Sequence, residues 1–129
     1  MDLEEARSRV TAEVDSAAAA VAGEADVEPL DDLGDAPCHD AMGAPTEEVD
    51  AAYEVEFKLG DRDMDEVVAA IRARWEEAGL EVADTVNADA GFPAVYASGE
   101  GFNYSLVGVR SRKVVRIGGS TPCLPPSEG

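Results

Sequence analysis

Apolar residues near the start of the chain recur at spacings of three and four, which places them on one face of a helix. The stripe consists of small and medium-sized residues: Leu3, Ala6, Val10, Val14, Ala17 and Val21. Gly23 follows it, and glycine commonly ends a helix. The pattern therefore predicts a helix over residues 2–22 that packs closely against the body of the protein.

The periodicity disappears after this helix. Between residues 24 and 49, prolines and glycines interrupt a stretch that holds many acids and no base. We expect an acidic loop over residues 23–50. A loop of this length inside a compact domain needs a pin or a function, and Cys38 could supply the pin.

A strand and a second helix come next. Apolar and polar residues alternate over 53–59, which is typical of a half-buried strand. Asp63 and Glu66 then form an acidic capping-box signature. The helix that follows carries an apolar face, and Gly79 occupies the position where glycine ends helices. The residues of that face are Met64, Val67, Val68, Ile71, Trp75 and Ala78.

Four short strands are expected after the second helix, over residues 80–87, 93–98, 102–109 and 114–118. Their short connections favour an antiparallel meander. We therefore expect one domain over residues 1–129, with a core at 51–124 and a tail at 125–129. The fold class is α+β: a two-layer sandwich with an antiparallel sheet of about four to five strands, helices on one face, and one disulfide.

The charge of the chain is extreme. Its 28 acids and 10 bases give a formal net charge of −18. Such a surface repels phosphate backbones, so nucleic acid is not an expected partner. The charge is uneven, because acids dominate residues 1–60 and bases dominate residues 101–129. Solubility explains the acids most simply; a partner with a basic face or a high-salt habitat would also explain them.

Cys38 and Cys123 are the only cysteines, and each follows a proline. They do not form a CxxC motif, and with His39 they offer three metal ligands at most, whereas structural zinc sites use four. We expect a Cys38–Cys123 disulfide, which indicates an oxidising compartment. The alternative is two independent thiols in a cytosolic protein. We expect neither a metal nor a cofactor.

Several short motifs occur in a recognisable order. Phe92-Pro93-Ala94-Val95-Tyr96 precedes Gly101-Phe102-Asn103-Tyr104-Ser105-Leu106, and the chain closes on Thr121-Pro122-Cys123. This order, with the Trp75 helix upstream, resembles small uncharacterised actinobacterial secreted lipoproteins over roughly residues 1–124. The resemblance implies export, a lipid anchor on a cysteine outside this chain, and the Cys38–Cys123 bridge. It implies no catalytic residue. The missing lipobox and the acidic N-terminal half depart from that pattern.

Two motifs invite a catalytic or metal interpretation. Cys38-His39-Asp40 could suggest a nucleophile with a base, but an oxidised Cys38 would rule this out. Asp61, Asp63 and Asp65 resemble the start of a calcium loop. Such a loop needs a glycine at the sixth position and a glutamate at the twelfth, where this chain has Glu66 and Arg72. We therefore expect no catalytic, cofactor-binding or metal-binding residue.

Two charged regions are candidate contact surfaces. Asp31, Asp32 and Asp35 lie in the acidic loop, where they could meet a partner with a basic face. The only basic patch consists of Arg110, Arg112, Lys113 and Arg116. It could contact anionic lipid heads or an acidic partner, although a charged turn that protects a sheet edge is the simpler interpretation.

These observations favour a non-enzymatic secreted or cell-envelope-anchored domain, a monomer, that binds an envelope protein or a small ligand. The alternatives are a small envelope hydrolase that uses carboxylates, and a secreted inhibitor or immunity-type protein. No signal peptide or membrane-spanning stretch is visible. We therefore expect an extracellular, cell-surface-anchored protein whose leader and lipid anchor lie outside this chain.

Overall fold

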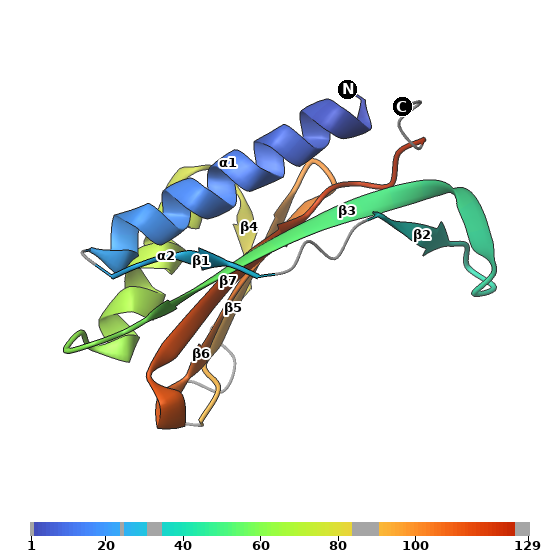
Figure 1. The fold of residues 1–129 in the computed structure, drawn as a ribbon. Coiled ribbons are helices and arrows are strands. Elements are labelled where there is room, and N and C mark those ends of the chain that lie inside the picture. The colour runs from blue at the N-terminus through green and yellow to red at the C-terminus, as the bar shows by residue number, and fades with distance from the viewer. Residues whose placement is uncertain (1, 24, 31–34, 84–90, 126–129) are drawn as a thin grey trace.

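The computed structural model describes residues 2–23, 25–30, 35–83 and 91–125 (Figure 1). These residues form two helices and seven strands, with all strand pairs antiparallel. The strand order is β1-β3-β7-β6-β5-β4, and β2 pairs with β3 as well. The α+β class and the helices on one face are confirmed, but the sheet has more strands than the expected four or five.

Helix α1, Leu3–Ala22, matches the predicted helix. The Asp2 side chain caps it by accepting a 2.8 Å hydrogen bond from the backbone N–H of Glu5. The predicted stripe is buried, together with Ala18 and Ala22. Because the stripe is rich in alanine, α1 can lie close to the sheet, where it packs on β3 and β7.

Helix α2, Met64–Glu77, begins after Asp63, which accepts a hydrogen bond from the backbone N–H of Asp65. It ends as predicted: Gly79 has a φ of 84°, and the Leu80 N–H bonds to the Trp75 carbonyl at 3.1 Å. The helix packs on β4, β5 and β6. Trp75 lies on the buried face and is 0% exposed, as its spacing predicted.

The meander follows the predicted order. β4 is Glu81–Val82, β5 is Ala94–Gly99, β6 is Phe102–Val109 and β7 is Val114–Ser120. A short 3-10 helix, η1 (Arg110–Arg112), joins β6 to β7. Part of the predicted 80–87 strand lies outside the described residues. The last strand of the meander, β7, pairs with β3 and so closes the sheet onto the N-terminal half.

The expected loop over 23–50 is largely wrong. β1 (Glu28–Pro29), β2 (Asp35–His39) and the first part of β3 (Pro45–Lys58) all lie within it. β2 and the start of β3 form a hairpin that projects from the body (Figure 1); we call residues 35–51 the arm. Sequence periodicity missed it because the arm residues from 36 to 48 are almost all exposed, so they carry no apolar alternation.

The expected disulfide is present, with Cys38 and Cys123 joined by a 2.07 Å S–S bond across 85 positions. Both cysteines are in segments that pair with the first half of β3. Cys38 belongs to β2, while next to Cys123 the backbone of Leu124 exchanges two hydrogen bonds with Val49. The bond therefore ties the base of the arm to the end of the chain.

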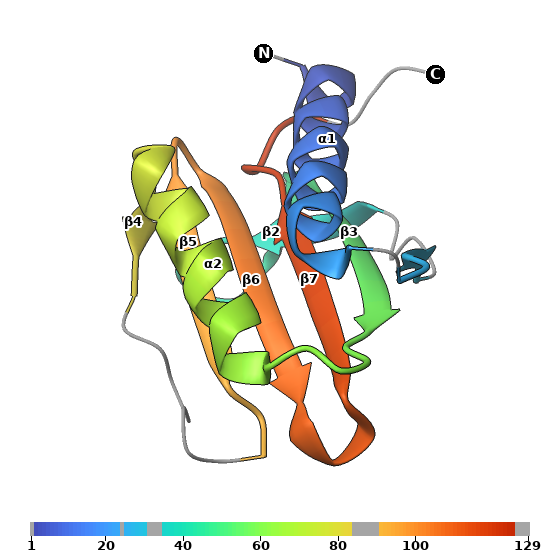
Figure 2. The same ribbon diagram turned by 90° about the vertical axis from the view of Figure 1, so that its left-hand side faces the viewer.

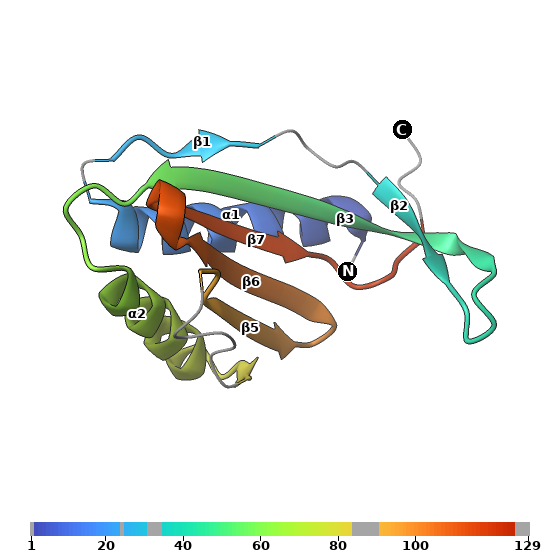
Figure 3. The same ribbon diagram turned by 90° about the horizontal axis from the view of Figure 1, so that it is seen from below.

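The layers are plain in Figure 2, where α1 and α2 lie side by side on one face of the sheet, with β6 and β7 visible between them. The core lies between the helices and this face. Figure 3 shows the opposite face, which no described helix covers. None of the described helices is both long and apolar enough to cross a membrane.

Replacing Trp75 with alanine should lower the free energy of unfolding by about 3–5 kcal/mol, the usual range for a deleted buried aromatic. Urea unfolding followed by circular dichroism measures this. Trp75→Phe is the matched control: it keeps a ring in the core and should cost clearly less. A loss below about 1 kcal/mol for Trp75→Ala would show that the side chain contributes little to the core.

The double variant Cys38→Ser, Cys123→Ser should lose roughly 4 kcal/mol of stability, because the bond closes a long loop in the unfolded chain. Amide hydrogen exchange should accelerate first at residues 45–51 and 121–124, where the bonded segments meet. Met42→Ala, at the 92% exposed tip of the arm, is the control and should change neither quantity. An unchanged unfolding midpoint in the double variant would contradict the argument.

Candidate functional site: a groove between the two helices

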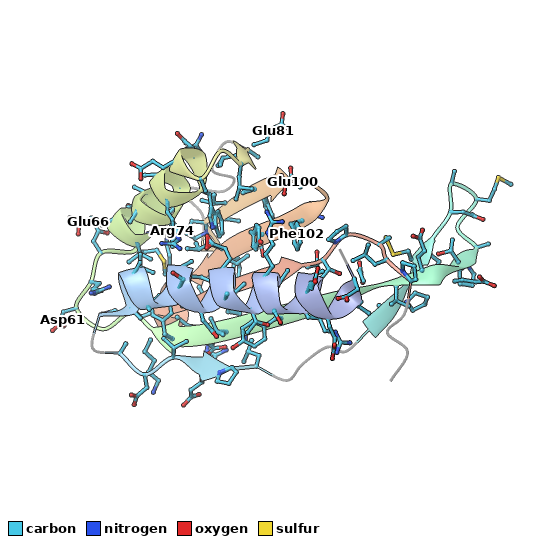
Figure 4. All side chains as sticks on the ribbon, turned by 90° about the horizontal axis from the view of Figure 1, so that it is seen from above. Asp61, Glu66, Arg74, Glu81, Glu100 and Phe102 are labelled. Carbon is cyan, nitrogen blue, oxygen red and sulfur yellow. A yellow bond between two sulfur atoms is a disulfide. The ribbon has the colours of Figure 1, made fainter. Side chains whose placement is uncertain are left out.

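An open groove of about 500 Å³ lies between α1 and α2. Residues of α1 form one wall, the end of α2 and the residues after it form the other, and β6 supplies the floor. The lining residues are Arg9, Ala12, Glu13, Ser16, Ala78, Leu80 and Tyr104. Figure 4 shows Arg74 between the two helices, with Phe102 and Glu100 toward the other end of the groove. We call this the interhelical groove.

An ion pair bridges the helices at one end of the groove. Arg74 of α2 donates to both carboxylate oxygens of Glu13, with distances of 3.2 Å and 3.0 Å. The same guanidinium donates to the Ser16 hydroxyl at 2.9 Å. Bidentate arginine–carboxylate pairs are geometrically specific, and these side chains are only 33% and 21% exposed. The pair therefore fixes the distance between the helices.

Arg9 lies toward the other end of the groove. One of its nitrogens pairs with Glu100 at 2.8 Å, and its guanidinium carbon lies 4.6 Å from the centre of the Phe102 ring. The side chains of this pair are 53% and 72% exposed, so the pair itself is worth only about 0–1 kcal/mol. The aromatic contact contributes about 0.5–1 kcal/mol at an exposed site, so it orients Arg9 together with the carboxylate.

Tyr104 forms the floor of the groove. Its ring is stacked on Phe102, with centroids 6.4 Å apart, and lies 6.0 Å from the Trp75 ring. Gly119, its partner on β7, makes room for it, because a Cβ atom there would lie 2.7 Å from the tyrosine ring. A glycine on β7 therefore leaves room for the large ring on the neighbouring strand β6.

The Tyr104 hydroxyl has unused hydrogen-bonding capacity. It makes no hydrogen bond to any residue within the described part of the chain. Burial raises the pKa of this phenol, the charge of Glu13 raises it further, and Arg9 lowers it. The hydroxyl therefore stays protonated at neutral pH, and it lies close enough to the α1 wall to interact with the charges of Glu13 and Arg9.

Trp75 is a natural reporter for this groove. It is the only tryptophan, it is fully buried, and its ring neighbours that of Tyr104. Its indole N–H has no hydrogen-bond partner in the part of the chain that the structure describes. A ligand that moves Tyr104 should therefore change the emission of a tryptophan that water does not reach.

A smaller cavity of about 230 Å³ lies between α1 and β3, lined in part by Arg7, Thr11 and Tyr53. Ligand pockets usually have volumes of 300–1,000 Å³, so this cavity is small for a ligand site. Beside it, the Tyr53 hydroxyl donates a 2.8 Å hydrogen bond to Asp15. Burial first, then the bond to Asp15 and its charge, raise the pKa of Tyr53 to about 12. The contact holds α1 against β3.

The predicted acidic contact surface is only partly described. Asp31 and Asp32 lie outside the described residues, and Asp35 begins β2. The arm exposes other acids, including Asp40, Glu47 and Glu48. The hypothesis that this region contacts a partner stays a prediction.

The four residues of the basic patch lie on two parts of the fold. Arg110 and Arg112 form part of η1, and Lys113 follows in the left-handed conformation. Arg116 lies within β7 and pairs with Glu56 of β3 at 3.1 Å. Arg110 pairs with Asp65 of α2 at 2.7 Å. Since two of the four bases have acidic partners within the protein, the simpler interpretation of a charged turn gains support.

The motifs weighed as catalytic or metal-binding have structural roles here. Cys38 is oxidised, so it is not a thiolate nucleophile. Asp40 caps the turn of the arm by accepting bonds from the backbone of Met42 and Ala44. Asp50 lies within 4.8 Å of both cysteine sulfurs, but these are bonded to each other and do not ligate a metal.

Comparison with protein-family models, with curated proteins and with solved structures found no match to this chain.

Sequence reasoning did not find the interhelical groove. Arg9, Glu13 and Ser16 lie at helical spacing beside the buried stripe of α1, so a polar stripe facing a neighbour was readable in principle. Its partner Arg74 is 61 positions from Glu13, and pairing at that range depends on how α2 docks.

Tyr53→Phe should make the free energy of unfolding fall less steeply as the pH rises above about 10. Because the folded-state pKa of about 12 exceeds the ordinary value of 10.0, the tyrosine contributes stability that is complete below about pH 10. That stability is lost as pH rises through about 12. Urea unfolding midpoints between about pH 8 and 11 measure the slope. If wild type and variant lose stability in parallel, Tyr53 is not the group responsible.

Proposed function

We propose that this chain is a non-enzymatic binding domain that holds a small ligand in the interhelical groove. The observation that carries the proposal is the Tyr104 hydroxyl, a hydrogen-bonding group on the groove floor that no described residue uses. This hydroxyl is not among the buried side-chain atoms that lack a partner in the described part of the chain, so solvent in the open groove can reach it. A ligand in the groove can take the place of that solvent and accept or donate a hydrogen bond there.

The walls support binding rather than catalysis. Glu13, which lines the groove, and Glu100, the ion-pair partner of Arg9, both accept hydrogen bonds from an arginine. A general acid or base needs a carboxyl group that can exchange its proton with substrate. The ion pairs instead hold both carboxylates against an arginine. The carboxylate hydrolase and the secreted inhibitor stay as alternative predictions.

The disulfide indicates a non-reducing environment. From this we extend the proposal to an exported protein. The resemblance to secreted lipoproteins adds a lipid anchor outside this chain, which would hold the protein at the cell surface. The high negative charge suits a soluble domain at the cell envelope. An anchored domain with a small-ligand groove would act as a receptor or carrier for a compound outside the cytoplasm.

Ala12→Phe should block the groove. Ala12 is an exposed position of α1 that lines it, so a larger side chain there fills the space without entering the core. A screen of amino acids, sugars, short carboxylates and amines would be read by Trp75 emission and by amide chemical shifts. Compounds that bind should lose at least about tenfold in affinity in the variant.

Ala19→Phe is the matched control, because Ala19 is equally exposed on the same helix but does not line the groove. It should leave every affinity unchanged. Binding that survives Ala12→Phe, or a screen in which no compound shifts the amides of residues 9–16 and 102–106, would refute the proposed function.

A further inference from the structure

We infer that the interhelical groove takes a small carboxylate with an apolar body, bound by Arg9 and the Tyr104 hydroxyl. This inference rests on the proposed function and narrows it to one class of ligand. It follows from the hydrogen-bonding groups that the groove offers, from their charges and from its apolar surfaces.

The groups available to a ligand are mainly donors. Arg9 carries five N–H donors, and within the described residues its hydrogen bonds are limited to one, with Glu100. The Tyr104 hydroxyl adds a donor, and the Ser16 hydroxyl, which accepts from Arg74, keeps its own proton to donate. A site rich in donors is complementary to a ligand rich in acceptors, and a carboxylate offers two acceptor oxygens.

The acids of the groove are not equivalent competitors for Arg9. Glu13 is held by two hydrogen bonds from Arg74 on the opposite helix, so its charge is balanced where it lies. Glu100 is 72% exposed and has one bond to Arg9. A carboxylate ligand can therefore replace Glu100 at Arg9 at little cost, because exposed ion pairs are weak.

Arg9 keeps its place when Glu100 leaves. Its guanidinium lies over the Phe102 ring at 4.6 Å, and that ring is in turn stacked on Tyr104. The two donors proposed to bind the ligand are therefore supported by one aromatic stack. A preorganised arginine loses less side-chain entropy on binding than a free one.

The rest of the groove suits an apolar body. Ala12, Ala78 and Leu80 lie along its walls, and Tyr104 lines it from β6. The net charge of the protein opposes any anion, but salt at physiological strength screens charges beyond about 8 Å. Arg9 lines the groove, whereas the charge of Glu13 is balanced by Arg74, so Arg9 favours a negatively charged ligand.

The test compares 4-phenylbutanoate with two analogues of the same shape, the neutral 4-phenylbutanamide and the cationic 4-phenylbutylamine. Calorimetry gives the affinities, and amide chemical shifts give the location. We expect the carboxylate to bind in the groove at least about tenfold more tightly than the amide. Arg9→Gln should remove this preference while leaving the amide affinity unchanged, and Tyr104→Phe should weaken the carboxylate several-fold.

Glu100→Gln gives the sharpest result. It removes the carboxylate that competes for Arg9, so the affinity for 4-phenylbutanoate should rise several-fold, which a merely structural role of Glu100 would not produce. Arg116→Gln is the matched control for Arg9→Gln. Like Arg9, Arg116 is partly exposed and pairs with one glutamate, but it belongs to β7 and does not line the groove. It should change nothing, and melting temperatures confirm that each variant is folded.

The outcomes separate the two proposals. If the amide or the amine binds the groove as tightly as the carboxylate, the groove is a binding site but the inferred ligand class is wrong. The same holds if 4-phenylbutanoate fails to bind while compounds of another class bind and are blocked by Ala12→Phe. If Glu100→Gln weakens carboxylate binding, the inference that the ligand replaces Glu100 as the partner of Arg9 is wrong. If no compound of any class binds there, both proposals fail.

Discussion

The pairing of β3 with β7 is the joint on which the rest of the structure depends. Residues 52–58 pair with 114–120 and so connect the N-terminal half of the chain to the C-terminal meander. α1 packs across this joint. Beyond the end of β7, the backbone of residues 121–124 continues to hydrogen-bond to β3, at Ala51 and Val49. Without the joint, the two strands that α1 covers would not form one surface.

The joint also produces the groove. α1 lies on β3 and β7, whereas α2 lies on β4, β5 and β6, so the two helices cover neighbouring parts of the same sheet face. Side chains on the floor then decide how much of the space between the helices is filled. Gly119 has no side chain, and the Tyr104 ring occupies the space that a side chain there would fill. The salt bridge between Glu13 and Arg74 connects the two helices at one end of this space.

The acidic surface creates a stability problem that the disulfide helps to solve. With a net charge of −18, the acidic side chains repel one another in any compact state. The arm adds exposed acids and almost no buried apolar surface, so hydrophobic burial cannot hold it. A covalent bond at its base restricts the unfolded chain instead, and this contribution does not depend on burial or on salt.

The sequence by itself determined both helices, their ends, the meander, the oxidised cysteines and the buried Trp75, since each leaves a local signature: a period, a capping residue or an even cysteine count. Only the tertiary structure decided the arm, the seven-stranded sheet and the groove. Backbone pairing holds the arm and leaves no apolar alternation in its residues. The groove joins Arg9, Glu13 and Tyr104 from separate elements, and their proximity follows from which strands each helix covers, a property of the whole sheet rather than of any local pattern.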